Sequence, residues 1–256
     1  METFSSEDFI REDPIQIPRL FQLKEDREIS GFLTALISWG QRKSILRSAY
    51  RLMDLMDFAP FQFITKKHPK VWRKLGGFVH RTFNSDDLMF ILAGLRYIYH
   101  EKGGLEDIFV YHLKRTGNLL DAISGVRAEF LKIPHLARSR KHLADPKAGS
   151  HAKRILLFLR WMIRRDVHQI DLGIWSRIPP SALYCPLDVH TGRAARALGL
   201  LNRKTDGRRA VEELTERLRI LCPEDPVRYD IALFHLGRPE NRVLLAHAPL
   251  FPSGDV

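Results

Sequence analysis

Residues 186–201, Pro-Leu-Asp-Val-His-Thr-Gly-Arg-Ala-Ala-Arg-Ala-Leu-Gly-Leu-Leu, contain the start, body and end of one predicted helix. Asp188 is placed to accept hydrogen bonds from the free amides of the first turn, and Gly199 supplies the left-handed stop. Arg193 and Arg196 lie one turn apart on this helix. A carboxylate among cations indicates chemistry on a polyanion, although a plain N-cap with solvated arginines fits the same pattern.

The composition indicates a globular protein with a basic surface. The chain has 256 residues, of which 45% are hydrophobic, and this is enough for a substantial core. Lysine and arginine number 41 against 30 aspartate and glutamate residues, so the formal net charge is +11. A phosphate backbone is the expected partner of such a chain, whereas the charge alone indicates no particular activity.

The cysteines and the N-terminus argue against several classes of protein. Cys185 and Cys222 are far apart and have no Cys-x-x-Cys or His-x-x-x-His companion. We therefore expect two buried thiols, and no zinc ribbon, iron–sulfur cluster, disulfide framework or other cofactor. The first residues show no signal-peptide pattern, and charge interrupts every long apolar stretch, so we expect no membrane span and a cytoplasmic location.

Helical spacing dominates the apolar pattern, which predicts an all-α fold. One apolar stripe covers residues 26–39 and a second begins at Ile45, so Gln41 falls at a helix junction. Further helices are expected over residues 85–100 and 105–113, behind polar and glycine-containing starts.

A basic segment divides the chain. Residues 132–149 combine prolines and a glycine with several cations, and they predict a mobile loop that faces phosphate. The ranges 26–131 and 150–237 on either side are expected to form two interlocked helical subdomains with a cleft between them. Together they would make residues 1–256 a single helical unit.

Residues 150–165 predict a buried helix, because their apolar side chains recur with helical period. Ser150 is the expected N-cap, which puts Lys153 in the first turn. There the helix dipole disfavours a cation, so a less basic and more nucleophilic amine is expected. Alternatively, Lys153 and Arg154 are surface residues that meet phosphate or solvent.

The pairing of Lys153 with Leu187-Asp188-Val189-His190, followed by Arg193 and Leu198-Gly199, resembles the helix-hairpin-helix DNA glycosylase superfamily, of which endonuclease III is a member. Leu36-Ile37-Ser38-Trp39-Gly40-Gln41 is similar to the stretch that leads into a DNA-facing turn in that family. The closing residues 211–237 are similar to its final two helices.

The predicted hairpin departs from the family pattern. The family usually reads Leu-Pro-Gly-x-Gly-x-Lys-Thr-Ala, whereas this chain has only Gly149 before Lys153, and Asp188 follows 35 positions after the lysine. The archaeal-type 8-oxoguanine DNA glycosylases look closer, because they too have an unusual hairpin and no metal cluster. The chain also resembles a widespread bacterial family of uncharacterised proteins with Phe-Leu-Arg-Trp-Met and Pro-Leu-Asp-x-His signatures.

The resemblance implies a DNA glycosylase with associated lyase activity, with an oxidised purine such as 8-oxoguanine as the favoured lesion. Lys153 would attack the anomeric carbon of a flipped nucleotide, expel the base and leave a Schiff base. Asp188 would accept the amine proton and stabilise the cationic sugar. Asp166 and Asp171 are rival carboxylates, unless Asp171 caps a turn or pairs with an arginine. The alternative is a non-enzymatic DNA- or RNA-binding protein on the same scaffold.

The remaining site predictions concern contacts to duplex DNA and the base pocket. Gln41 is expected to fill the gap that a flipped base leaves. The other residues expected to bind DNA are Arg42, Lys43, Gly149, Ser150, His190 and Arg193. The aromatic candidates for the base pocket are Trp39, Trp161 and Trp175, although aromatic residues at helical spacing also suit a core.

Overall fold

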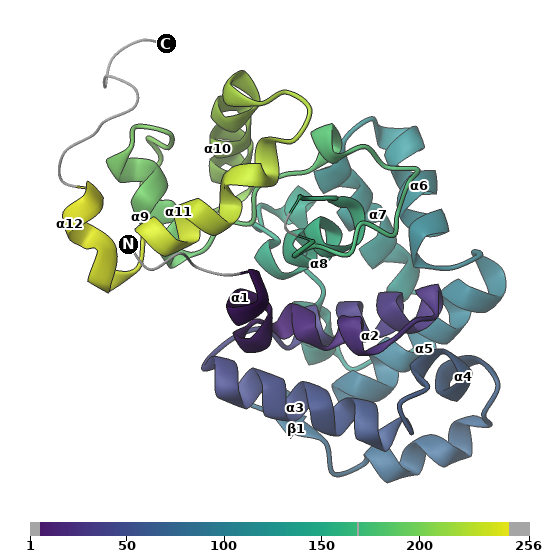
Figure 1. Ribbon diagram of the computed structural model, residues 1–256. Helices are drawn as coiled ribbons and strands as arrows, with labels where there is room; N and C mark the ends of the chain where they lie inside the picture. The colour runs from purple at the N-terminus through teal and green to yellow at the C-terminus, as the bar shows by residue number, and fades with distance from the viewer. Residues whose placement is uncertain (1–5, 168, 246–256) are drawn as a thin grey trace.

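The computed structural model describes residues 6–167 and 169–245, and this part of the chain is built almost entirely of helices (Figure 1). The α-helices are α1 (Ser6–Glu12), α2 (Lys24–Leu36), α3 (Arg42–Leu55), α4 (Pro60–Thr65), α5 (Ser85–Glu101), α6 (Leu105–Thr116), α7 (Leu119–Phe130), α8 (Lys153–Ile163), α9 (Val189–Ala197), α10 (Arg208–Leu221), α11 (Asp230–Leu236) and α12 (Arg242–Leu245). The all-α prediction is confirmed. None of the helices in the described part is long and apolar enough to cross a membrane.

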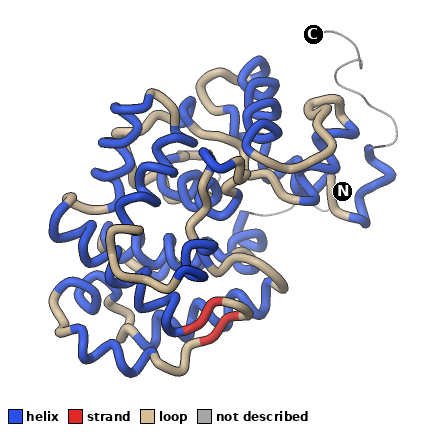
Figure 2. Tube along the Cα trace, turned by 180° about the vertical axis from the view of Figure 1, so that it is seen from behind, coloured by secondary structure: helices blue, strands red, loops and turns tan. Residues whose placement is uncertain are grey.

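Among the described residues, a short hairpin departs from the helical pattern that the periodicity indicated. Strands β1 (Val79–His80) and β2 (Phe83–Asn84) pair antiparallel, and Figure 2 shows them beside the helices in red. With two residues in each strand, the hairpin is too short to produce an alternating apolar pattern. It leads directly into α5.

Helix α8 is the central element of the core. It packs on α2, and α6 and α7 pack on each other beside it (Figure 1). Phe158 of α8 meets Phe32 of α2 edge to face with ring centroids 5.4 Å apart, and Phe32 stacks on Phe130 of α7 at 5.5 Å. These contacts join α2, α7 and α8 in one hydrophobic core, so the pocket-facing side of α8 rests on a rigid base.

Two helix starts follow the predicted chemistry. The Asn84 side chain accepts hydrogen bonds from the amides of Asp86 and Asp87 at the start of α5, and the Asp87 carboxylate accepts one from the Asn84 amide. Asp188 caps α9 in the same way, and the chain leaves that helix through Gly199, whose φ is +72°. Local sequence is sufficient here because the capping groups lie within three residues of their partners.

The predicted start of α8 is wrong. The helix begins at Lys153, and Ala152 occupies the N-cap position in a left-handed conformation with φ of +49°. Ser150 therefore cannot reach the amides of the first turn, and its Oγ accepts a hydrogen bond from the Ala152 amide instead. Lys153 is the first residue of the helix, so its side chain leaves α8 at the very end of the helix.

The basic segment 132–149, which the sequence predicts to be a mobile loop that faces phosphate, connects α7 to α8. It contains two 3-10 turns, η4 (Ala137–His142) and η5 (Pro146–Ala148). The carboxylate of Asp87 is fully buried, and it accepts a hydrogen bond from Ser139 at 2.6 Å and an ion pair from Arg138 at 3.0 Å. A buried carboxylate needs such partners, so the segment is held against the start of α5.

Helix α11 lies against α9, and the contact is closest at Gly237, which ends α11 (Figure 1). A Cβ atom added at Gly237 would stand 1.8 Å from the backbone oxygen of His190. The Gly237 carbonyl also accepts hydrogen bonds from Arg193 at 2.6 Å and from His190 at 3.3 Å. These three residues therefore fix the distance between α9 and α11.

We predict that Gly237→Ala destabilises the protein by roughly 1–3 kcal/mol, because the added methyl group forces α9 and α11 apart. The matched control is Gly77→Ala, where the nearest atom to an added Cβ is 3.9 Å away on the flexible Arg51 side chain. Chemical denaturation of both variants measures the difference. Equal stabilities would show that α9 and α11 can separate without cost.

Candidate functional site

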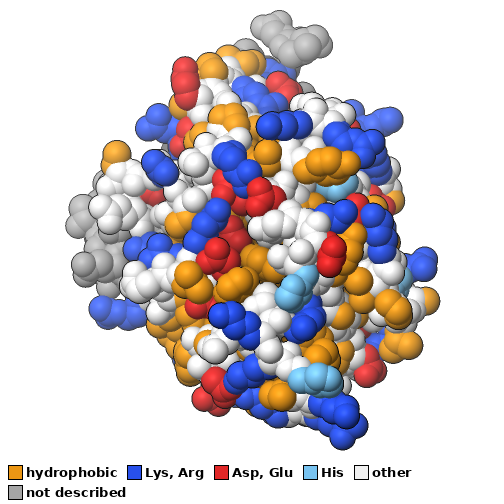
Figure 3. All heavy atoms as spheres, turned by 90° about the vertical axis from the view of Figure 1, so that its right-hand side faces the viewer, with side chains coloured by type: hydrophobic (Ala, Val, Ile, Leu, Met, Phe, Trp, Pro, Cys, Tyr) orange, Lys and Arg blue, Asp and Glu red, His pale blue; other side chains and the backbone are white. Residues whose placement is uncertain are grey.

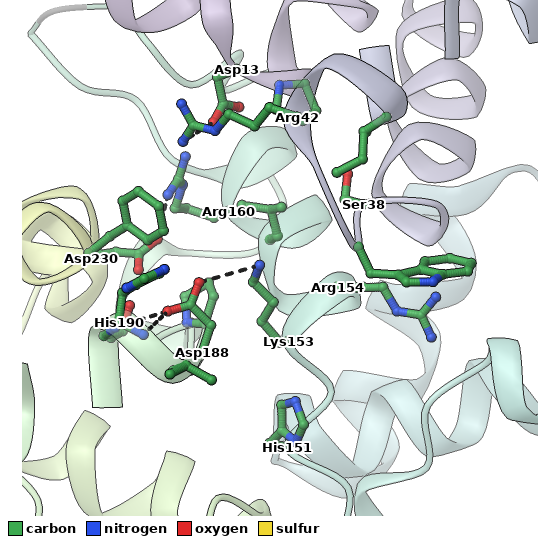
Figure 4. A pocket seen from close by; sticks show the side chains of 18 of the residues that line it. Asp13, Ser38, Arg42, His151, Lys153, Arg154, Arg160, Asp188, His190 and Asp230 are labelled. Carbon is green, nitrogen blue, oxygen red and sulfur yellow. Dashed lines mark hydrogen bonds and ion pairs between the residues drawn. The ribbon is translucent and has the colours of Figure 1, made fainter. Parts of the chain in front are cut away.

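A pocket of about 800 Å³ lies where α1, the turn between α2 and α3, the start of α8, and helices α9 and α11 meet (Figure 4). Its walls combine aromatic rings with charged side chains. The volume falls in the range of small-molecule sites and would accommodate a purine nucleoside. The pocket therefore brings together five segments from different parts of the sequence.

Lys153 and Asp188 converge in this pocket. The Lys153 Nζ is 3.5 Å from Asp188 Oδ2, and Figure 4 shows the amine turned toward the carboxylate. Asp188 Oδ1 accepts hydrogen bonds from the amides of His190 and Thr191, each at 2.9 Å. One carboxylate oxygen thus holds the start of α9 while the other faces the amine, so the same aspartate serves as helix cap and as partner of Lys153.

Both side chains remain open to solvent, with exposed fractions of 29% for Lys153 and 20% for Asp188. They can therefore meet a ligand that enters the pocket. A 3.5 Å separation between partly exposed groups is a weak ion pair, which a ligand can open at little cost.

Behind this pair lies a buried group of charged side chains, Arg160 with its partners Asp171 and Asp230, which we call the charged floor of the pocket. The sequence interpretation did not identify Arg160. Its side chain is only 4% exposed, and its Nε donates to Asp171 Oδ1 at 3.1 Å. Its Nη1 makes a short contact with Asp230, which is itself buried. Burial disfavours the guanidinium charge, but the two carboxylates outweigh it and raise the pKa of Arg160. Asp171 therefore pairs with an arginine, as one of the two sequence interpretations expected.

The wall on the other side of the pocket contains Trp39. The Arg154 guanidinium lies over its ring, 4.7 Å from the centroid, and donates to the Leu36 carbonyl. His80 meets the ring edge on, and His142 stacks beside it, with centroids 5.1 Å and 6.1 Å away. Burial lowers the pKa of both histidines, which favours their neutral forms next to Trp39.

Trp161 and Trp175, the other two tryptophans predicted for the base pocket, do not line it, so this part of the prediction is wrong. Trp161 is fully buried, and Trp175 is 1% exposed. Trp175 donates to Glu28 at 2.6 Å, and its ring packs against Phe109 and Phe158. The apolar face of α8 and the segment after it turn into the core, so these rings stabilise the fold and cannot stack on a ligand.

The structure divides the predicted DNA contacts. Three of them line the pocket, namely Arg42, Ser150 and His190. Four lie outside it, namely Gln41, Lys43, Gly149 and Arg193, and the first three of these are exposed.

Several of these side chains already have protein partners. Arg42 lies 3.6 Å from Asp13 and over the Phe234 ring, whereas His190 and Arg193 both bind the Gly237 carbonyl. The last two thus hold α11, a role that the sequence did not indicate. On the face shown in Figure 3, basic side chains lie among acidic ones and form no continuous stripe.

The two cysteines are buried, as the sequence predicts. Cys185 and Cys222 are both free thiols. Burial raises the pKa of the Cys185 thiol well above its usual value, which makes it a poor nucleophile. Among the described residues, no group of three or more histidine, cysteine or carboxylate side chains is arranged to hold a metal ion.

A scan against protein-family models matches residues 13–238 to a family described as a protein of unknown function, DUF2400. The match covers most of the chain and includes both Lys153 and Asp188. A search of curated proteins and a search of solved structures found no match.

Proposed function

The chain belongs to the DUF2400 family, and we propose that it is a DNA glycosylase with lyase activity that excises a damaged base through Lys153. The observation that carries this proposal is the Lys153 amine 3.5 Å from the Asp188 carboxylate in a pocket of about 800 Å³. The all-α fold, the net charge of +11 and the resemblance to helix-hairpin-helix glycosylases support it. The two-subdomain arrangement expected from that resemblance is part of the proposal.

The chemistry follows from the residue types. The neutral amine of Lys153 forms a bond to C1′ of an extruded nucleotide, and the C1′–N bond breaks with its electrons going to the base. Asp188 accepts the proton that the amine loses, and the departing base takes up a proton. Opening of the sugar ring then gives a Schiff base, from which loss of a C2′ proton and the 3′ phosphate cleaves the strand.

One oxygen of Asp188 is held by the backbone at the start of α9. Its Oδ1 accepts hydrogen bonds from two backbone amides at 2.9 Å, which fix the orientation of the carboxylate. The other oxygen, Oδ2, faces the Lys153 amine, so in the proposed complex it lies next to the sugar carbon on which positive charge develops. The proposed substrate is an oxidised purine such as 8-oxoguanine, for which the pocket has sufficient volume.

Borohydride trapping tests the proposal. The purified chain is incubated with duplexes that carry oxidised or deaminated bases, or an abasic site, and is then reduced. We expect a covalent protein–DNA adduct with at least one of these duplexes. If the protein binds the duplexes and forms no adduct with any of them, it is a non-enzymatic nucleic-acid-binding protein instead.

The Asp188→Asn variant separates capping from catalysis. Asparagine caps helices as well as aspartate does, so thermal stability is expected to stay close to that of the wild type. The excision rate in a single-turnover assay is expected to fall by about 10²–10⁴-fold, because the proton acceptor and the negative charge are lost. Asp188→Ala, which also removes the cap, is expected to cost about 1 kcal/mol of stability in addition. An unchanged rate in Asp188→Asn would exclude a catalytic carboxylate at this position.

A further inference from the structure

Arg154 differs from every other arginine that lines the pocket. Arg42 pairs with Asp13, Arg160 pairs with two aspartates, and Arg238 pairs with Glu240. By contrast, no carboxylate of the described residues lies within 4 Å of the Arg154 guanidinium. Within the described part of the chain, Arg154 is therefore a pocket cation with no counter-ion.

The surroundings of Arg154 make this charge costly. One N–H group donates to the Leu36 carbonyl at the end of α2, and one face of the guanidinium lies over Trp39. Burial lowers the pKa of Arg154 to about 10, which is the direction expected for a desolvated cation without a partner. An arginine has five N–H donors, so most of its hydrogen-bonding capacity is left for a ligand.

The wall around Arg154 is basic as well. Lys141 and His151 also line the pocket, and Figure 4 shows the Arg154 guanidinium pointing away from Asp188. Asp188 and the charged floor of Asp230 lie toward α9 and α11 instead. Charge is therefore distributed unevenly in the pocket. Arg154, which has no counter-ion among the described residues, lies at one end, and the pair of Lys153 and Asp188 lies further along.

We infer that Arg154 binds a backbone phosphate of the DNA strand that carries the excised base, and that Trp39 holds the guanidinium in place for this contact. Arginine suits the task because its planar fork matches a phosphate and it is weakly hydrated. Stacking on an aromatic face leaves the edge of the guanidinium free to donate to an anion. This inference rests on the proposed function, because it takes the ligand to be the substrate strand.

The test is a double-mutant cycle between the protein and the DNA backbone. The ligand is a duplex with a stable tetrahydrofuran abasic analogue, and single methylphosphonate linkages remove one phosphate charge at a time around it. For the unmodified duplex, Arg154→Met is expected to weaken binding about tenfold. It is also expected to reduce the slope of log Kd against log salt by about one.

At one linkage, the methylphosphonate is expected to weaken the wild type but not Arg154→Met. Arg154→Lys keeps the positive charge, so it is expected to retain the salt dependence of the wild type. This variant also keeps the proposal testable if Arg154→Met does not fold. Arg73→Met, at an exposed residue outside the pocket, is the matched control and is expected to lower the affinity less. Purely additive losses at every linkage would show that Arg154 only supports the end of α2.

Trapping and binding failures can be told apart. If the wild type forms the borohydride adduct while the losses are additive, the phosphate contact is wrong and the glycosylase proposal stands. If the cycle shows coupling at one linkage without any adduct, the phosphate contact stands and the catalytic proposal is wrong. If the wild type does not bind the duplex, both are overturned.

Discussion

Replacing Lys153 by glutamine is expected to abolish borohydride trapping and to slow base excision by roughly 10³-fold or more, because the attacking nitrogen is lost. Glutamine is close to lysine in reach and remains polar. The Lys153 side chain is 29% exposed and its ion pair with Asp188 is weak, so the fold should tolerate the change. Single-turnover excision and circular dichroism on the same sample measure both effects.

Lys141→Gln is the matched control for this substitution. Lys141 lines the same pocket and is exposed, and the ion pair with Asp188 is made by Lys153 instead. Its variant is expected to keep trapping, with at most a loss of affinity. If Lys153→Gln formed as much covalent adduct as the wild type, another amine would form the Schiff base. The assignment of Lys153 as the nucleophile would then be wrong.

Local signals in the sequence predicted most of the helices. Caps such as Asn84 and Asp188 act on amides two or three residues away, so their effect can be read without knowing the fold. The left-handed stop at Gly199 is local in the same sense. The start of α8 could not be found in this way, because nothing in the identity of Ala152 favours a left-handed conformation.

The site was predictable only in part, since its members come from distant segments. The approach of Lys153 to Asp188 followed from a family resemblance, and the 35 intervening residues by themselves do not fix it. Trp161 and Trp175 were misplaced because aromatic identity does not reveal which face of a segment turns inward. Arg154 was open to two interpretations, and its lack of a counter-ion among the described residues became visible only in the folded structure.

Arg160 illustrates most clearly that the sequence does not identify the partners of a buried charge. It stands alone within the apolar run Leu-Phe-Leu-Arg-Trp-Met, and a single charge in a buried face indicates a partner without naming it. Its partners, Asp171 and Asp230, are 11 and 70 positions away. Only the packing of α8 against α11 and the segment around Asp171 brings the three side chains together.

The Arg160→Met variant is therefore expected to lose about 3–5 kcal/mol of unfolding free energy, because two buried carboxylates would lose their shared cation. Arg203→Met is the matched control, since Arg203 pairs with Glu213 at 3.1 Å but is 48% exposed. Removing that surface pair is expected to cost at most about 1 kcal/mol. Denaturant unfolding followed by circular dichroism measures both changes.

The double variant Arg160→Met with Asp230→Leu identifies the origin of the loss. If the penalty comes from an uncompensated charge, removing that charge should restore much of the stability, because Asp171 keeps its ion pair with Arg164 at 3.1 Å. If the penalty comes from lost packing around Arg160, the double variant should be no more stable than the single one. A loss below about 1 kcal/mol in Arg160→Met would contradict the ionised cluster itself, because a buried charge pair broken on one side costs more than that. The pocket would then have a neutral floor behind the pair of Lys153 and Asp188.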